Sequence, residues 1–444
     1  MGQNALTNIS NALYKKEKYI GDMLANPGKE PILTVINSAK KETKAGQDLK
    51  EYVKVKIRPS GGWMLTTEGG NYPAGQPQLS IEGYQEPRLI THTLEYTTHA
   101  LAALNNQPAG KVGETVAKDI ELFLDTARRR KSRLFTGRGD MVLARAAAAG
   151  TSATFTSTTD VPVRACIGDY LIAYTAATDN EERLYQAADT GASYIGDAAT
   201  TAMVYVNDVD YDANTVTLSR STAIWSDDAV LVPYGASSSN YTGPQGIEAL
   251  YDTVNDASFA WDSEDAASID HVDTIFNLVR STYSQLNVST VGTSGYLTLD
   301  KIQRGVGKCV GKGATASDLA LILHPKQFEK LTQSHFSKVG EWKTLTMAGQ
   351  EMDIFCVTGL GSAQIPCIVD YGIKESAVLL LDKSKLYSIE LPGGWDNDGG
   401  SMFQKKNATS GYGHAAAKVA YWNMWINWYS IFPNTSCIIY GLSS

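Results

Sequence analysis

The feature that most constrains the fold is an amphipathic stretch over residues 108–137. Apolar residues recur three or four positions apart along it, the spacing of one helical face: Val112, Val116, Ile120, Phe123 or Leu124, Ala127 and Leu134. Pro108 precedes the predicted helix, and Gly137 stands where a left-handed cap would end it. At about 1.5 Å per residue the helix is roughly 40 Å long. Because the stripe is narrow, we expect a strut with a sheet or loop along one side and water or a partner subunit on the other.

Charge is ordered along the same stretch. Acids occupy its first two thirds, and bases crowd its last turns: Arg128, Arg129, Arg130, Lys131 and Arg133. Such a cluster can contact phosphate, but bases at the C-terminal end of a helix also complement the helix dipole while remaining solvated. The second interpretation is favoured.

Length and composition set the class of protein. A chain of 444 residues with 43% hydrophobic and 19% charged residues has globular values and material for two to four domains, or for one elaborated domain. No window approaches a membrane-spanning run, the N-terminus lacks a signal-peptide pattern, and Leu6 stands where a myristoylation signal needs Ser or Thr. We expect a cytoplasmic protein. The five cysteines are scattered without paired spacing, which predicts free thiols and no zinc site.

The charge distribution divides the chain. The net charge is −8, and residues 151–242 alone hold twelve acids against three bases, a balance of −9. The first 58 residues have eleven bases against six acids, a balance of +5. A basic arm of this kind is typical of a solvated face or of a segment that lies near nucleic acid or a partner's acids.

Periodicity along the chain predicts the order of elements. Residues 1–50 form an arm, residues 51–58 and the segment from Pro87 alternate as strands, and a glycine-rich loop without a core of its own lies between them. We expect this loop to find its partner surface on another subunit. Strands at 170–174, 202–206, 215–218 and 229–233 predict a small inserted β domain.

Helix and strand patterns mix after residue 247. We predict helices over 268–286 and 326–336, a buried strand over 318–325, and further strands at 352–357, 366–369, 377–382, 386–391 and 436–440. In the strand before the last, Trp422, Met424, Ile426 and Trp428 share one face and Tyr421, Trp425 and Tyr429 the other. Both faces should therefore be covered.

The motifs that suggest chemistry are weak. Residues 305–313, GVGKCVGKG, are misspaced for a phosphate-binding loop, so a turn between helix and strand is favoured. Asp208, Asp210 and Asp212 resemble the start of a calcium loop, but Ala213 and Ser219 replace the glycine and glutamate that it needs. The histidines show no metal spacing and no nucleophile elbow occurs, although a triad can form from distant residues. We expect no enzyme activity, no cofactor and no metal.

The order of parts resembles the major capsid protein family of tailed phages, whose fold is similar to that of encapsulins and of the herpesvirus capsid floor. The resemblance covers residues 50–150 and 243–444. It rests on TTEGGNYP in the loop, PRLITHTLEYTTHAL before the helix, DLALILHPKQFEKL, and the final NWYSIFPNTSCIIYG.

The resemblance implies an α+β phage capsid fold with the following parts. They are an N-terminal arm (1–50), an extended loop with flanking strands (51–100), the spine helix of a peripheral domain (101–150), an inserted acidic β domain (151–242), a mainly axial domain (243–385), peripheral strands and loop (386–430), and the C-terminal axial strand (431–444). The insertion is a departure from the minimal family. A long N-terminal scaffolding segment, which some members have, is also missing from this sequence.

The function implied is a shell of hexamers and pentamers that encloses double-stranded DNA in a virion, assembled in the host bacterial cytoplasm. Expected partners are the chain itself, a separate scaffolding protein, a portal protein and a cement or decoration protein, with DNA bound without sequence specificity and no membrane. No lysine lies between Lys56 and Lys111, so we expect no covalent lysine–asparagine cross-link from the loop. The predicted inter-subunit contacts are Arg58, Trp63, Met64, Glu68, Tyr72, Arg88, Arg128, Arg129 and Arg130. Two alternatives remain open: an encapsulin-like compartment shell, and an intracellular α+β enzyme with a β insertion.

Overall fold

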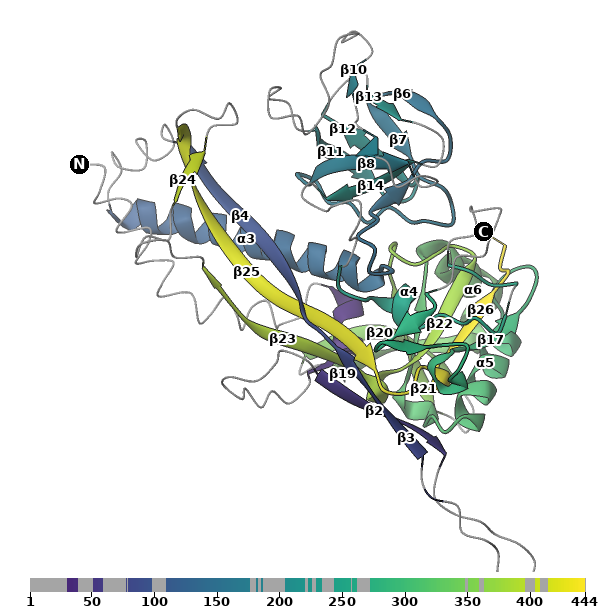
Figure 1. The fold of residues 1–444 in the computed structure, drawn as a ribbon. Coiled ribbons are helices and arrows are strands. Elements are labelled where there is room, and N and C mark those ends of the chain that lie inside the picture. The colour runs from purple at the N-terminus through teal and green to yellow at the C-terminus, as the bar shows by residue number, and fades with distance from the viewer. Residues whose placement is uncertain are drawn as a thin grey trace, which may run out of the picture.

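The computed structural model describes residues 30–38, 51–58, 77, 79–97, 109–175, 181–182, 185–186, 204–219, 223–225, 229–233, 243–256, 258–261, 272–347, 350–358, 363–395, 404–407 and 414–443. One long helix and several long strands lie together, a second part packs shorter helices against another sheet, and a third part is built of strands (Figure 1). Helices and strands are thus segregated, which makes the fold α+β, as predicted.

The long helix is α3, Ala109–Thr136, which confirms the helix predicted over 108–137. Leu124, Ala127 and Phe135 are buried, whereas Leu122 is 69% exposed, so one narrow stripe packs and another side is free. The predicted left-handed cap at Gly137 is wrong: the first glycine with a positive φ is Gly139, at 94°. The backbone of Gly246 packs against the last turn of α3, where an added Cβ would lie 2.3 Å from the Phe135 carbonyl oxygen.

A sheet that we call the peripheral sheet lies along α3 (Figure 1). Its strand order is β1 (Asn37–Ser38), β23 (Leu386–Trp395), β25 (His414–Ser430) and β24 (Gln404–Asn407), and β4 (Arg88–Thr97) pairs with the other edge of β25. Trp422, Met424, Ile426 and Trp428 of β25 are buried as predicted, and the Trp428 ring centroid lies 5.1 Å from that of Phe135. On the other face Tyr421 and Trp425 are only half-buried, so the predicted cover there is partial.

A second sheet, which we call the axial sheet, has apolar residues on both faces. Its strand order is β17 (Ser289–Gly292), β26 (Cys437–Tyr440), β22 (Ala377–Asp382), β18 (Leu319–Leu323), β21 (Gln364–Val369), β20 (Gln350–Thr358) and β19 (Gly340–Met347). Every residue of β18 and β22 is buried. Leu379 and Leu381 join the core that contains α3 residues, while Leu380 joins a second core with Ile302 and Val306 of α5. One strand thus ties two cores together.

Helices and short 3-10 turns complete the described chain. They are η1 (Pro31–Val35), α4 (Ile247–Leu250), η2 (Ser284–Leu286), α5 (Leu299–Gly311), η3 (Ala316–Asp318), α6 (Pro325–Val339), η5 (Lys383–Lys385) and η6 (Pro433–Thr435). The helix predicted over 326–336 and the strands predicted after residue 318 are thereby confirmed.

Strands of the inserted region, residues 143–233, form sheets with a core of their own beyond the C-terminal end of α3 (Figure 1). The larger sheet contains β5 (Ala144–Arg145), β14 (Ala229–Pro233), β8 (Tyr170–Thr175), β11 (Val204–Asp210), β12 (Thr215–Leu218) and β7 (Thr154–Thr156), with β9 (Glu181–Glu182) beside β8; the smaller contains β10 (Tyr185–Gln186), β13 (Ala223–Trp225) and β6 (Gly150–Ser152). The four predicted strands are present. Because β5 lies before residue 151, the sheet begins earlier than the predicted insertion, and the division into domains stays a prediction.

The helix predicted over 268–286 is wrong. Residues 272–286 instead contain a hairpin of β15 (Thr274–Ile275) and β16 (Leu278–Val279), followed by η2. Phe276 and Asn277 between the two strands have φ of 57° and 58°, which a helix does not allow. The apolar residues at helical spacing were therefore misleading, because Phe276 is buried while Val279 is 45% exposed.

The turn predicted over residues 305–313 is also wrong for most of its length. Residues 305–311 belong to α5, whose Ile302, Val306 and Cys309 form a buried stripe. Gly305 allows close packing, since an added Cβ would lie 2.5 Å from Leu380 Cδ1. Only Lys312 and Gly313, which has a φ of 99°, form the turn.

Candidate assembly site

The most distinctive feature of the surface is a two-stranded ribbon that leaves the body of the molecule (Figure 1). It consists of β2 (Glu51–Arg58) and β3 (Leu79–Gln85), which within the described residues pair only with each other. Its partner strands run from Glu51 opposite Gln85 to Arg58 opposite Leu79, and Leu79 is 45% exposed. A two-stranded ribbon is marginally stable in water without a covering surface. Among the described residues no third strand pairs with this ribbon.

The root of the ribbon is fixed to the body. Tyr84 N donates to the Phe276 carbonyl oxygen at 3.2 Å, and Gln85 Nε2 donates to Gln245 Oε1 at 3.0 Å. Position 83 must be glycine, because a Cβ there would lie 2.7 Å from both Cβ and O of Phe276. The ribbon consequently starts from a defined position and direction.

The β15–β16 turn contacts the ribbon root, and the side chain of Arg280, just after β16, anchors this hairpin to the body. The buried Arg280 guanidinium donates to the carbonyl oxygens of Val272 at 2.7 Å and Asp252 at 3.0 Å, and it also binds those of Ala249 and Leu286. Burial lowers the pKa of Arg280 to about 10, so the side chain stays charged at neutral pH. These bonds tie the segment before β15 and the residues after β16 to residues 249–252.

Among the five bases at the end of α3 only Arg129 is exposed, so the solvated cluster favoured from the sequence is wrong for the other four. Arg130 Nε lies 2.7 Å from Asp169 Oδ1 in the inserted region, and Lys131 Nζ lies 2.7 Å from Glu390 Oε1 on β23. Arg133 Nη1 lies 2.8 Å from Asp370 Oδ1, and its guanidinium lies 4.5 Å from the centre of the Tyr211 ring. The acids Asp169, Glu390 and Asp370 are therefore paired with bases of the same chain. The cluster joins α3 to two other parts of the subunit.

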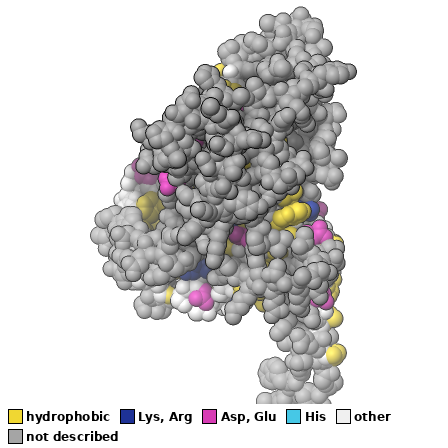
Figure 2. Space-filling model, turned by 90° about the vertical axis from the view of Figure 1, so that its left-hand side faces the viewer, with side chains coloured by type: hydrophobic (Ala, Val, Ile, Leu, Met, Phe, Trp, Pro, Cys, Tyr) yellow, Lys and Arg dark blue, Asp and Glu magenta, His cyan; other side chains and the backbone are white. Residues whose placement is uncertain are grey.

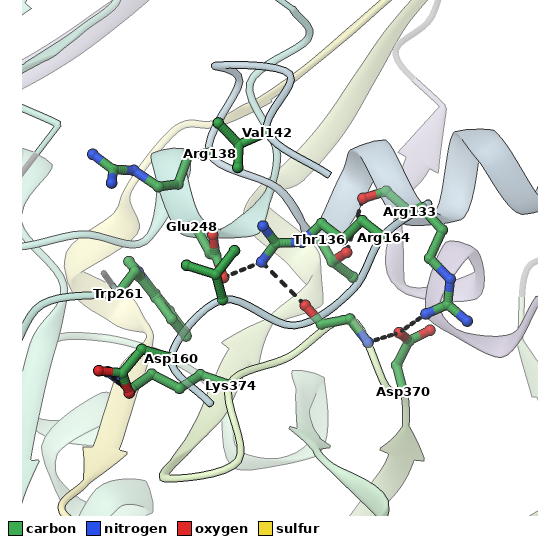
Figure 3. A network of polar contacts seen from close by, with 12 residues as sticks. Arg133, Thr136, Arg138, Val142, Asp160, Arg164, Glu248, Trp261, Asp370 and Lys374 are labelled. Atoms are coloured by element: carbon green, nitrogen blue, oxygen red, sulfur yellow. Dashed lines mark hydrogen bonds and ion pairs between the residues drawn. The ribbon is translucent and has the colours of Figure 1, made fainter. Parts of the chain in front are cut away.

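Two chain segments, residues 137–143 and 243–246, connect the inserted region to the rest, and we call them the neck. Gly243 N donates to the Gly139 carbonyl oxygen at 2.7 Å. Beside the neck, Arg164 Nη2 pairs with Glu248 Oε1 and donates to the Gly372 carbonyl oxygen at 3.3 Å (Figure 3). Lys374 Nζ lies 2.7 Å from Asp160 Oδ1. Charged pairs therefore cross between the inserted region and the body.

Within this network, burial disfavours the charged form of the Glu248 carboxyl group. Burial raises its pKa to about 7, and the neighbouring Arg164 and Arg138 guanidinium groups oppose that rise. Both side chains of the Arg164–Glu248 pair are only 3% exposed. A buried pair of this kind is costly to break because the remaining charge has no water.

The predicted contact residues fall into three groups. Trp63, Met64, Glu68 and Tyr72 lie outside the described residues, and Arg58 ends β2. Arg88 begins β4 beside the ribbon root. On α3, Arg128 is buried and pairs with Asp125 at 3.2 Å, Arg130 binds Asp169, and Arg129 is exposed. Their contacts with another subunit stay predictions.

The motifs examined for chemistry have structural explanations. Asp208, Asp210 and Asp212 lie on a strand–turn–strand, where Asp210 Oδ1 accepts hydrogen bonds from the backbone N of Asp212 and Ala213 at 3.0 Å. The five cysteines are buried and none of them forms a disulfide, and burial raises the pKa of Cys166 to about 12. Burial lowers the pKa of His92 and His324 to about 4. In the described part of the chain, no group of His, Cys, Asp or Glu is arranged to hold a metal, and no helix is long and apolar enough to cross a membrane.

Sequence reasoning missed the acids and bases around the neck. Asp160, Glu248, Asp370 and Lys374 lie in loops or a short helix without periodicity, so their partners could not be inferred. The one available signal was Arg164, one of only three bases among the twelve acids of residues 151–242.

The sequence and the fold can be compared with those of known proteins. No model of a known family matches the sequence, and no curated protein matches it. Among solved structures, the chain is similar to the capsid of cyanophage A-1(L), at 9% identity and a TM-score of 0.45, with 93% of each chain covered. It is similar to the capsid of the native GTA particle, at 8% identity and a TM-score of 0.41, covering 94% of this chain and 99% of that one. An encapsulin of Synechococcus elongatus matches 37% of this chain and 57% of its own, at 14% identity and a TM-score of 0.25. These structural neighbours are capsid and encapsulin shells, the class that the sequence resembles.

Proposed function

We propose that this chain is a major capsid protein that self-assembles into hexamers and pentamers, forming the icosahedral shell around the double-stranded DNA of a tailed phage. The ribbon β2–β3 carries the proposal: it projects from a fixed root and lacks a covering surface within the described subunit. A neighbouring subunit would supply that surface, and burial between chains would add the apolar contact that the ribbon lacks.

The rest of the described subunit suits such a role. The peripheral sheet and α3 form a stiff, elongated support, with Trp428 against Phe135 in its core. Part of this support remains available for contact, since Leu89 of β4 is 48% exposed and Leu122 of α3 is 69% exposed. In Figure 2 the described part of one side shows small separate groups of hydrophobic, acidic and basic side chains, without a large field of one charge.

The proposed role is structural and not enzymatic. Its partners would be further copies of the chain, a separate scaffolding protein, a portal protein and a cement or decoration protein, with packaged DNA held without sequence specificity. The protein would belong to the virion and assemble in the host bacterial cytoplasm.

Electron microscopy tests the proposal directly. We expect the protein, expressed with its scaffolding partner, to form closed shells that contain both hexamers and pentamers. Particles that enclose protein cargo instead of DNA would favour an encapsulin-like compartment. A subunit that stays unassembled under these conditions would contradict the proposal.

The ribbon root offers a sharper test. Gly83→Val places side-chain atoms where Phe276 already lies, so the ribbon should change direction and shell formation should fail while the subunit stays folded. Gly311→Ala is the matched control, because no atom lies within 4 Å of a Cβ added there. Normal shells from Gly83→Val would refute the role of the ribbon.

We also propose that the shell is locked without covalent cross-links. Mature particles boiled in detergent under reducing conditions should run as one band near 48.0 kDa. A ladder of covalent oligomers would contradict this.

A further inference from the structure

A polar cavity of about 190 Å³ opens at the root of the ribbon. Five parts of the chain that are distant in sequence line it: the end of β3 and start of β4, the two segments of the neck, the β15–β16 turn, and β25. Its position matters because the ribbon starts here, so a subunit that covers the ribbon would come close to the cavity.

Three amide side chains of the cavity wall, those of Gln85, Gln245 and Asn427, already have partners. Asn427 Oδ1 accepts hydrogen bonds from Gln245 N at 2.8 Å and Trp428 N at 2.9 Å, and its Nδ2 donates to the Glu86 carbonyl oxygen. Gln85 Nε2 donates to Gln245 Oε1. The wall is therefore fixed before any ligand arrives, and these amides do not select the ligand.

Two arginines supply the charge. The Arg88 side chain lines the cavity and makes no hydrogen bond or ion pair with any residue that the structure describes. Arg138 lines it too, and its Nε lies 3.9 Å from Asp140 Oδ2. In Figure 3 the Arg138 guanidinium points away from the Arg164–Glu248 pair. A guanidinium group presents several N–H donors in a plane, which matches a carboxylate or a phosphate.

One acid limits the choice of ligand. Glu86 lines the same cavity, so the charged side chains of its wall are two guanidinium groups and one carboxylate, and Asp140 lies outside the wall, 3.9 Å from Arg138. This balance favours a singly charged anion over a doubly charged phosphate, because Glu86 would repel the second charge. The chain itself is rich in suitable groups, with a net charge of −8.

We propose that this cavity is a socket for a carboxylate side chain of a second copy of the chain, bound by Arg88 and Arg138. The proposal rests on the proposed function, since it needs neighbouring copies. It adds a defined polar contact at the root of the ribbon, where an acid from the neighbour would fix the register between subunits.

Zero-length cross-linking tests the socket in assembled shells. Arg88→Lys places a primary amine at the cavity, and a carbodiimide condenses an amine with a carboxylate to an amide while the carbodiimide takes up the water as a urea. Shells assembled from equal amounts of light and isotope-labelled copies should give mixed-label peptides that join position 88 to an Asp or Glu of another copy. Arg304→Lys, at an exposed position of α5, is the matched control.

Assembly measurements give the second readout. Arg88→Gln should raise the subunit concentration needed for assembly about tenfold, the equivalent of one lost charged contact per subunit. Arg304→Gln should leave it unchanged. If the wild-type chain forms shells but Arg88→Gln assembles equally well and position 88 gives no mixed-label link, the socket is refuted and the proposed function stands. If no variant and no wild-type chain assembles, both fail.

Inorganic phosphate separates a free anion from a neighbour's side chain. Added phosphate should not raise the melting temperature of unassembled subunits more for the wild type than for Arg88→Gln. A phosphate-dependent rise that Arg88→Gln removes, together with no link at position 88 in shells, would assign the cavity to a free anion and overturn the carboxylate socket.

Discussion

The axial sheet and the junction of the inserted region are held together by different physics. In β18 and β22 every residue is buried, and their alternate side chains fill two apolar cores. At the junction, Arg130 pairs with Asp169, Arg164 with Glu248, and Lys374 with Asp160. Apolar burial depends on area and tolerates many arrangements, whereas buried charges need one particular partner each. The body should therefore be robust, and the seating of the inserted region should depend on a few matched residues.

The largest loss of stability is expected from a substitution in the apolar core that contains Trp428 and Phe135. Trp428→Ala removes a fully buried ring that packs on Phe135, so the free energy of unfolding should fall by about 3–5 kcal/mol. Urea unfolding followed by circular dichroism measures it. Tyr296→Ala, at a residue that is 53% exposed, serves as the control and should cost far less. If both variants lowered the free energy of unfolding equally, the larger contribution expected from the buried Trp428 would be contradicted.

Breaking one charged pair should come next. Arg164→Met leaves Glu248 buried without its partner and should cost about 3 kcal/mol in the stability of the junction. The double variant Arg164→Met/Glu248→Leu should recover most of that loss, because no buried charge remains. Urea unfolding and limited proteolysis at the neck follow both. A double variant as unstable as the single one would mean that the pair positions the inserted region through its geometry and not only through its charge.

The same pair predicts a pH dependence. Burial raises the pKa of Glu248 from 4.5 to about 7, so folding favours the protonated carboxyl group. Its stabilising contribution is complete below pH 4.5 and is lost as the pH rises to about 7. Urea midpoints of wild type and Glu248→Gln, measured between pH 5 and 8, should differ by an amount that changes with pH in this direction. A constant difference would show that the pKa of Glu248 does not change on folding.

The smallest effect is expected at an exposed ion pair. Lys326 Nζ lies 2.7 Å from Glu375 Oε1, but the lysine side chain is 35% exposed. Lys326→Met should therefore change the free energy of unfolding by less than about 1 kcal/mol. A loss as large as that of Arg164→Met would contradict the view that burial, and not charge alone, makes the junction pairs important.

Part of the candidate site could be predicted from the sequence. The glycine-rich loop lies mostly outside the described residues, so its contact with another subunit stays a prediction, whereas the strands predicted beside it include β2, which pairs with β3. Arg88 was singled out and lines the cavity at the ribbon root. The basic cluster on α3 was misjudged, since Arg128 and Arg130 find acids within the same chain. A sequence shows the charge of a residue but not which distant acid will lie beside it.

The sequence by itself determined the elements whose evidence is local. The spacing of apolar residues set α3, and alternation set β4, β25 and the strands of the inserted region, because one helical or extended face must leave water wherever it packs. Only the tertiary structure decided the β15–β16 hairpin, the continuation of α5 through its glycines, and the charged pairs of the neck. Phe276 has a left-handed backbone in a hairpin whose Arg280 binds the carbonyl oxygens of Asp252 and Ala249, and Leu380 leaves no room for a Cβ at Gly305. Asp252, Ala249 and Leu380 are distant in sequence from the residues they contact, so no local pattern could reveal these contacts.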